Sequence, residues 1–141
     1  MAPSPLENLV AVGKLHVAVH SAGEIGTLIR RSVGLLRDAQ VKRLALESRF
    51  SLAYGAAHGL ALAALWRCGY RSDDRQTVFA ALAHTTRLSH GSQRVLVSAH
   101  RIRNQMEYEA DDRVDEGLLR SLVSATAELA GHLDAGSQLD G

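Results

Sequence analysis

A run of side chains capable of acid–base chemistry and phosphate binding stands at positions 100–108, with the sequence HRIRNQMEY. Arginine presents a planar fork of donors that fits phosphate oxygens, and asparagine can bond a phosphate, a 2′-hydroxyl or a base edge. A tyrosine ring can stack on a base. Histidine titrates near neutral pH and is the natural acid or base of a metal-independent ribonuclease. The residues that could carry such chemistry here are His100, Arg101, Arg103, Asn104 and Tyr108.

Helical spacing predicts that these side chains share one face. Each residue of a helix advances about 100°, so Asn104 lies one turn from both His100 and Tyr108. Arg101 falls on the same face, and Arg103 falls at its border. The apolar residues of the segment form a narrow stripe that should face the core: Val95, Ala99, Ile102 and Met106.

A solvated polar face is the alternative interpretation of the same pattern. Arg103 and Glu107 are four residues apart and can form an ordinary helical ion pair worth a few tenths of a kcal/mol. A polar face of this kind needs no function. The spacing alone leaves both interpretations open.

Composition favours one small helical domain. The chain has 141 residues, 46% of them hydrophobic and only 4% aromatic, so Leu, Val and Ala must build most of the core. An alanine-rich chain whose two prolines stand at positions 3 and 5 favours helices. The formal net charge of +1 provides no global attraction to nucleic acid, so any such binding needs a local patch.

Several other classes of site lack their sequence patterns. Cys68 is the single cysteine, which excludes an internal disulfide and a thiolate metal cluster. The histidines form no Glu-x-x-His pair, and we predict neither a metal site nor a cofactor. No run of about 18 apolar residues stands in the sequence, and we expect a soluble cytoplasmic protein with no membrane partner.

The periodicity predicts a single all-α domain over 1–141, a bundle of about five helices with no convincing strand. Residues 1–20 should hold a short helix and an irregular or extended piece, and residues 135–141 should fray. Ser21 and Glu24 form a capping box that starts a helix ending near Ala39. The longest helix, from about Leu44 to Cys68, is apolar on several sides and should be central, with Gly69 terminating it.

Three more helices complete this prediction. Ser72 or Asp73 should cap the first of them, which has Val78, Phe79, Leu82 and Ala83 inside. A loop over 85–91 should lead to the helix of Arg103, from about Ser92 to Tyr108. Asp111-Asp112 should break that helix and cap the last one.

The segment Arg103-Asn104-x-x-x-Tyr108 resembles the signature of the HEPN domains, small helical ribonucleases and nucleotide-binding modules. That signature is an arginine, often followed by a polar residue, then four to six positions, then histidine. The alanine-rich segment 48–58, the turn Gly69-Tyr70-Arg71-Ser72 and the segment 78–85 also resemble parts of bacterial HEPN-like proteins. The resemblance covers roughly residues 45 to 133. It departs from the family where Tyr108 replaces the histidine, which removes the general acid/base.

This resemblance implies a homodimer in which Arg103 and Asn104 line a cleft between the copies. It implies an RNA- or nucleotide-binding protein, with Arg101 and Tyr108 as further binding residues, in a toxin–antitoxin or stress-response system. A nucleotidyltransferase-type antitoxin protein is the protein partner that it implies. The first alternative is a metal-independent ribonuclease toxin with Arg103 and His100 as catalytic residues. The second alternative is a non-catalytic dimerising module for protein interaction.

Overall fold

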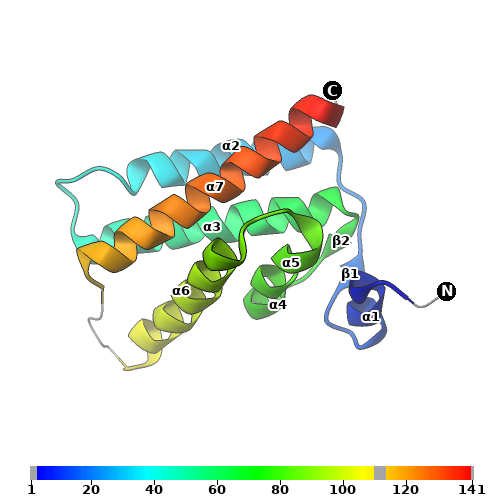
Figure 1. Ribbon diagram of the computed structural model, residues 1–141, viewed down its shortest axis with the longest axis horizontal. Coiled ribbons are helices and arrows are strands. Elements are labelled where there is room, and N and C mark those ends of the chain that lie inside the picture. The colour runs from blue at the N-terminus through cyan, green and yellow to red at the C-terminus, as the bar shows by residue number, and fades with distance from the viewer. Residues whose placement is uncertain (1–2, 110–113, 141) are drawn as a thin grey trace.

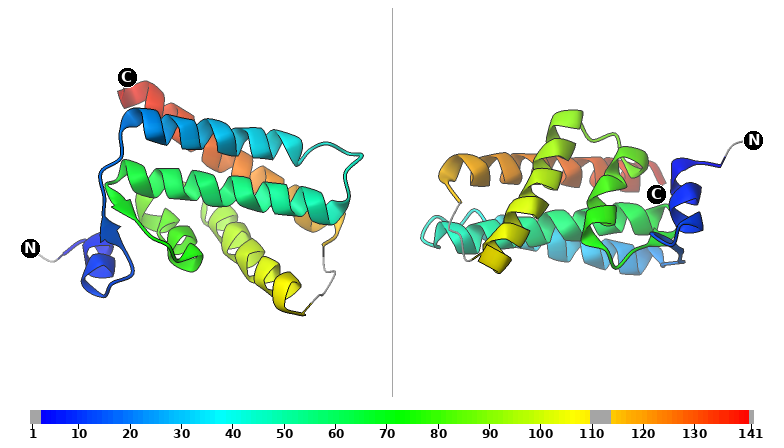
Figure 2. Two further views of the ribbon diagram at one scale, coloured as in Figure 1. Left: turned by 180° about the vertical axis from the view of Figure 1, so that it is seen from behind. Right: turned by 90° about the horizontal axis from the view of Figure 1, so that it is seen from below.

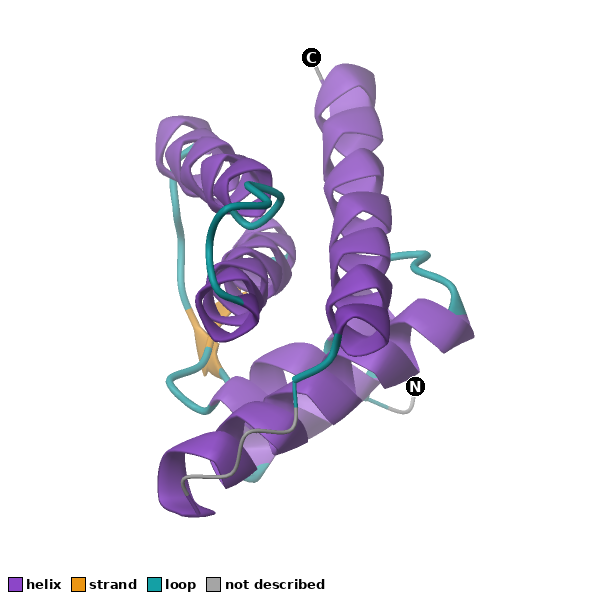
Figure 3. Cartoon of the chain, turned by 90° about the vertical axis from the view of Figure 1, so that its left-hand side faces the viewer, coloured by secondary structure: helices purple, strands orange, loops and turns teal. Residues whose placement is uncertain are grey.

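The computed structural model describes the backbone of residues 3–109 and 114–140 and the side chains of residues 3–107 and 114–134. Within these ranges the chain is an all-α helical bundle, as predicted (Figure 1; Figure 3). The elements in order are α1 (Pro5–Ala11), β1 (His16–Val17), α2 (Ala22–Asp38), α3 (Leu46–Arg67), β2 (Tyr70–Arg71), α4 (Arg75–Ala80), α5 (Leu82–Thr85), α6 (His90–Glu109) and α7 (Glu116–Asp140).

Helix α3 is the centre of the bundle. It contacts α2 and α7 on one side and α4, α5 and α6 on the other (Figure 2). Its buried residues point in several directions around the helix, as expected for a central helix with no single apolar face. They are mostly small, and they include Ala53, Ala56, Ala57, Gly59, Leu60, Ala61, Ala63 and Ala64.

Small residues let α2 approach α3 closely. A Cβ added at Gly59 would stand 2.1 Å from Oγ of Ser32 and 3.2 Å from its Cβ. Ser32 is buried, and its hydroxyl donates to the carbonyl oxygen of Leu28 in the preceding turn of α2. The two backbones can lie this close only because residue 59 has no side chain.

Local capping signals explain where several helices begin. Ser21 and Glu24 form the predicted capping box of α2, and Gly69 has the positive φ of +90° that ends α3. The predicted cap of α4 was wrong, because its N-cap is Asp74. Ser72 instead donates to the carbonyl oxygen of Lys14 and accepts from the backbone N–H of Asp74.

The extended piece near the N-terminus pairs with the residues that follow α3. His16 and Val17 form a short antiparallel ladder with Arg71 and Tyr70, so the prediction of no strand was wrong. The period-two pattern of this piece did indicate extended backbone. Its pairing partner stands more than fifty residues away, beyond the reach of a local pattern.

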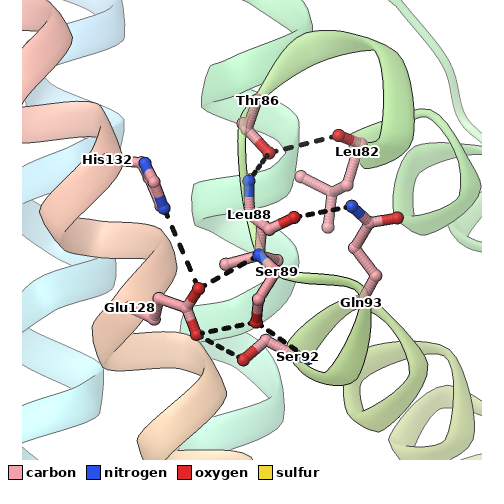
Figure 4. A network of polar contacts seen from close by, with 8 residues as sticks. All are labelled: Leu82, Thr86, Leu88, Ser89, Ser92, Gln93, Glu128 and His132. Atoms are coloured by element: carbon pink, nitrogen blue, oxygen red, sulfur yellow. Dashed lines mark hydrogen bonds and ion pairs between the residues drawn. The ribbon is translucent and has the colours of Figure 1, made fainter.

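The start of helix α6 is fixed by a carboxylate from α7. Glu128 accepts hydrogen bonds from the backbone N–H of Ser89, from the Ser89 hydroxyl and from the Ser92 hydroxyl (Figure 4). The Ser89 hydroxyl also accepts from the backbone N–H of Ser92. These bonds satisfy groups at the helix start that have no partner within the helix. Helix α6 therefore begins at His90, two residues before the expected start.

Helix α6 is also rotated relative to the expected orientation. Among its described side chains, Leu96 and Ala99 are fully buried, whereas Val95 and Ile102 are only partly buried. The predicted stripe omitted Leu96, and including it turns the inner face of the helix toward Arg103. This rotation decides which polar residues of α6 meet the rest of the bundle.

The last helix faces the core with a row of leucines. Leu119, Leu122, Leu129 and Leu133 are buried. The backbone N–H of Leu118 donates to the Asp115 carboxylate at 2.7 Å, while the predicted cap Asp111-Asp112 lies outside the described residues. The helix continues to Asp140, past the position where we expected it to fray.

Candidate functional site

Polar and aromatic side chains from α3, α4 and α6 meet around the ring of Tyr54. Tyr54 is buried, with 3% of its surface exposed, so this is an interior site at the edge of the core. Only part of it was predicted, because the local sequence carries no record of which helices meet. We call these residues the Tyr54 cluster: Tyr54, His58, Arg75, Phe79, His100, Arg103 and Asn104.

A hydrogen-bonded chain holds the imidazole of His100. Its Nδ1 lies 2.8 Å from the Tyr54 hydroxyl, and its Nε2 lies 3.3 Å from Nδ2 of Asn104. If the Asn104 amide donates to Nε2, then Nδ1 carries the proton and donates to the Tyr54 oxygen. The Tyr54 proton is then free to be donated to another acceptor. Both nitrogens of His100 have partners in this arrangement.

Two guanidinium groups lie against the same tyrosine ring. The Cζ atom of Arg103 is 5.2 Å from the centroid of the Tyr54 ring, and that of Arg75 is 5.6 Å away. Arg103 also pairs with Glu107 at 2.7 Å between Nη2 and Oε1. The Arg103 side chain is 28% exposed and that of Glu107 52% exposed, so the arginine is the more deeply placed partner.

Phe79 of α4 forms the apolar wall of the cluster. Its ring centroid lies 5.8 Å from that of Tyr54, 5.7 Å from that of His100 and 6.0 Å from that of His58. The contact with His58 is edge-to-face, a favoured arrangement of two rings. Phe79 is 2% exposed and so excludes water from one side of both imidazoles.

Burial and the arginines keep both imidazoles neutral. The pKa of His58 is lowered to about 4, first by burial and then by the charges of Arg75, His100 and Arg103. The pKa of His100 is also lowered, by burial first and then by Arg103 and Arg75, although the Asp74 carboxylate opposes this. Near neutral pH the positive charge of the cluster therefore comes from its two arginines.

The structure brings together three of the residues that the sequence singled out. His100, Arg103 and Asn104 belong to the Tyr54 cluster, and Arg103 lies further inside than the predicted border position. Arg101 is not part of it, because this exposed side chain points to another face and donates to Ser98 at 3.4 Å. Tyr108 lies in the last turn of α6, but its side chain is outside the described residues.

Sequence reasoning missed Tyr54, Arg75 and Phe79 as site residues. Tyr54 and His58 stand one turn apart on α3, a spacing that places them on one helix face. Nothing near Arg75 in the sequence signals its role, because its contact depends on how α4 packs against α3. Such a contact is tertiary and is absent from local periodicity.

Arg101 lines a separate open groove beside the cluster, with a volume of about 450 Å³. Helices α4 and α6 form this groove, and Phe79 belongs to both the groove and the cluster. Its lining residues are Phe79, Ala80, His90, Gln93, Arg94, Val97, Ser98 and Arg101.

The described residues offer neither a metal-binding cluster nor a membrane-spanning helix. In residues 3–109 and 114–140, no three His, Cys, Asp or Glu side chains gather as metal ligands would. Over the same ranges, none of the helices has both the length and the apolar character needed to cross a membrane.

Comparisons of the chain with protein-family models, with curated proteins and with solved structures gave no match.

Proposed function

We propose that this protein binds RNA or a nucleotide through a phosphate group at the Tyr54 cluster, with Arg103 as the principal contact. The observation that carries this proposal is the position of Arg103, turned inward against Tyr54 and beside His100. A guanidinium offers several donors in one plane, and the pair with Glu107 uses only some of them. Asn104, at the rim of the cluster, is suited to a ribose hydroxyl or a base edge.

The balance of charge favours this function over a purely solvated face. The ion pair of Arg103 with Glu107 is the one expected for such a face. A solvated face, however, gives no reason for a second arginine to lie against the buried Tyr54 ring, nor for two neutral imidazoles to pack against the neighbouring Phe79. Excess positive charge at a partly dehydrated site attracts anions strongly, because the local dielectric screens charge less than bulk water does.

Binding without cleavage is the version that we favour. Both nitrogens of His100 are hydrogen-bonded, so a substrate would have to displace Asn104 to reach Nε2. Tyr108 stands where the HEPN signature has histidine. A ribonuclease is the second candidate, because a neutral imidazole beside an arginine is in the right state to act as a general base.

The HEPN resemblance adds an assembly to this proposal. In it, two copies of the chain form a homodimer that acts in a toxin–antitoxin or stress-response system with a nucleotidyltransferase-type partner. Sedimentation of the purified protein would measure the dimer directly. A monomer at micromolar concentration would remove the shared cleft from the proposal and leave the phosphate site of the single chain.

RNA binding to matched arginine variants tests the proposal. Fluorescence anisotropy of a labelled single-stranded RNA should detect binding by the wild type that weakens with salt. Arg103→Ala should reduce affinity by about tenfold or more, since a hydrogen bond to a charged group is worth roughly 1.5–3 kcal/mol. Arg87→Ala removes the same charge from an exposed loop position and should leave affinity nearly unchanged.

The same RNA, examined for cleavage without added metal, separates the alternatives. Intact RNA with binding that depends on Arg103 supports a binding module. Cleavage that disappears in both Arg103→Ala and His100→Ala would establish the ribonuclease instead. Cleavage by Tyr108→His but not by the wild type would identify Tyr108 as the reason that the wild type does not cleave RNA. Equal RNA affinity of the wild type and Arg103→Ala would contradict the proposal and favour the dimerising module.

A further inference from the structure

Arg75 is a charged residue of the cluster that the proposed function leaves unused. It is the first residue of α4, directly after the N-cap Asp74, and it is partly buried against Tyr54. In the described part of the chain no carboxylate forms an ion pair or hydrogen bond with it. A partly buried guanidinium without an anionic partner is unusual, because removing its charge from water is costly.

The carboxylates near Arg75 have other partners. Glu107 is bound to Arg103. The carboxylate of Asp74 accepts from the Thr77 hydroxyl and from the backbone N–H of Gln76, and these bonds lower its pKa and cap α4. Among the described side chains, the cluster therefore combines two guanidiniums with one directly paired carboxylate, so Arg75 can donate to another acceptor.

We propose that Arg75 and Arg103 together clamp one tetrahedral oxyanion beside Tyr54, the phosphate group of a nucleotide or RNA, and that its binding draws a proton onto His100. The two guanidinium carbons are 5.6 and 5.2 Å from one ring centroid, and both charges act on His58 and His100, so the two arginines border the same small region of the cluster. Arginine forks suit such an anion because they can donate two parallel hydrogen bonds to it. This inference rests on the proposed site but assigns a second, separate ligand residue from another helix.

The proton follows from the charges around His100. The groups that face it are Tyr54 and His58 from α3, Asp74 and Arg75 from α4, and Arg103 from α6. Burial and the two arginines lower the pKa of His100 before the anion arrives. A bound anion offsets the arginine charges and raises this pKa again, so binding should take up a proton and should tighten as pH falls. The proton goes to Nε2, and the Asn104 amide turns so that its oxygen accepts from the new N–H.

Sulfate is the appropriate first probe for this linkage. It has the shape of phosphate but keeps the same charge across the range in which histidine titrates, so any pH effect comes from the protein. Isothermal titration calorimetry at about pH 6 and about pH 8 measures its affinity. Repeating the titration in buffers of different ionisation enthalpy counts the protons taken up.

Arginine variants identify the clamp. Arg75→Gln and Arg103→Gln should each weaken sulfate binding by about tenfold or more, whereas the exposed Arg87→Gln should not. Arg75→Lys should recover part of the affinity, because it restores the charge without the fork. Circular dichroism of each variant verifies the fold. Wild-type affinity in a folded Arg75→Gln would overturn the inference, and so would the absence of sulfate binding by the wild type.

A histidine variant tests the proton. His100→Gln should retain sulfate binding near pH 8 and lose the gain in affinity at lower pH. A gain that persists in His100→Gln, or no proton uptake by the wild type, would overturn this part.

RNA and nucleotide probes separate this inference from the proposed function. Adenosine 5′-monophosphate and an RNA strand without terminal phosphates present the phosphate as a monoester or as a diester. Arg75-dependent sulfate binding without affinity for either would refute the proposed function and leave the clamp intact. Loss of RNA binding in Arg103→Gln with no loss in Arg75→Gln would keep the function and remove the clamp.

Discussion

His100 is the residue on which the chemistry of the site depends most closely. Tyr54 and Asn104 hold its ring nitrogens, and Phe79 packs against its ring. An imidazole with this many contacts has little freedom to rotate. Its lowered pKa makes it neutral in the free protein. A fixed neutral ring links the Asn104 amide to the Tyr54 hydroxyl in one hydrogen-bonded chain, in which each bond polarises the next.

The buried imidazole of His58 predicts an acid-sensitive fold. Its pKa is lowered to about 4 in the folded chain and returns to about 6.5 on unfolding. The unfolded chain therefore binds more protons between these values, and the stability that His58 contributes is present above pH 6.5 and lost as pH falls toward 4. The expected loss is about 2 kcal/mol, reduced from the full shift because the ring is partly exposed.

Urea unfolding at pH 7 and near pH 4.5 measures this effect in the wild type and in His58→Gln. The variant cannot titrate at this position and should lose less stability on acidification than the wild type. Carboxylates titrate in the same range in both proteins, so only the difference between them reports on His58. An identical pH dependence would show that His58 does not carry the acid sensitivity.

Helices α2 and α3 pack closely together and support the site. Gly59 allows the closest approach between them, opposite the buried Ser32. Tyr54 and His58 project from this same α3, so a shift of α3 relative to α2 would also move them. At the other side of the site, Glu128 of α7 fixes the start of α6.

Gly59→Ala should destabilise the bundle by about 1 kcal/mol. Its new methyl group would displace the Ser32 hydroxyl from its bond to Leu28 and strain the contact with α2. Overpacking of this kind costs about 1–3 kcal/mol, and the better helix propensity of alanine offsets about 1 kcal/mol of it. Thermal or urea unfolding measures the net change.

Gly55→Ala is the matched control on the same helix. A Cβ at Gly55 would meet only Cδ1 of Leu35 at 3.5 Å, an ordinary contact. This variant should be as stable as the wild type or slightly more stable, because only the propensity term remains. If both variants gained stability, the close approach of α2 and α3 would not constrain position 59.

For the whole molecule, local sequence signals predicted the class of fold well. The capping box at Ser21 and Glu24, the terminating Gly69 and the many-sided apolar pattern of α3 act within a few residues and need no tertiary information. The starts of α4 and α6 were placed less accurately. The cap of α6 comes in part from Glu128, which lies nearly forty residues away in the sequence.

The candidate site was predicted only where it lies on one helix. His100, Arg103 and Asn104 could be found from their spacing along α6. Arg75 and Tyr54 could not, because their meeting depends on how three helices pack. The predicted apolar stripe also omitted the buried Leu96, which lies about 100° around the helix from Val95. Including Leu96 turns the buried face toward Arg103, so the prediction had placed Arg103 too far from the core.

The most direct test of the central claim is to locate the RNA on the protein through its histidines. Long-range ¹H–¹⁵N NMR resolves the imidazole nitrogens, and the seven histidines are spread over the chain. Titration with single-stranded RNA should shift the signals of His100 and His58 most and leave those of His16 and His132 in place. Unmoved signals of His100 and His58, with shifts confined to other histidines, would contradict a phosphate site at the Tyr54 cluster.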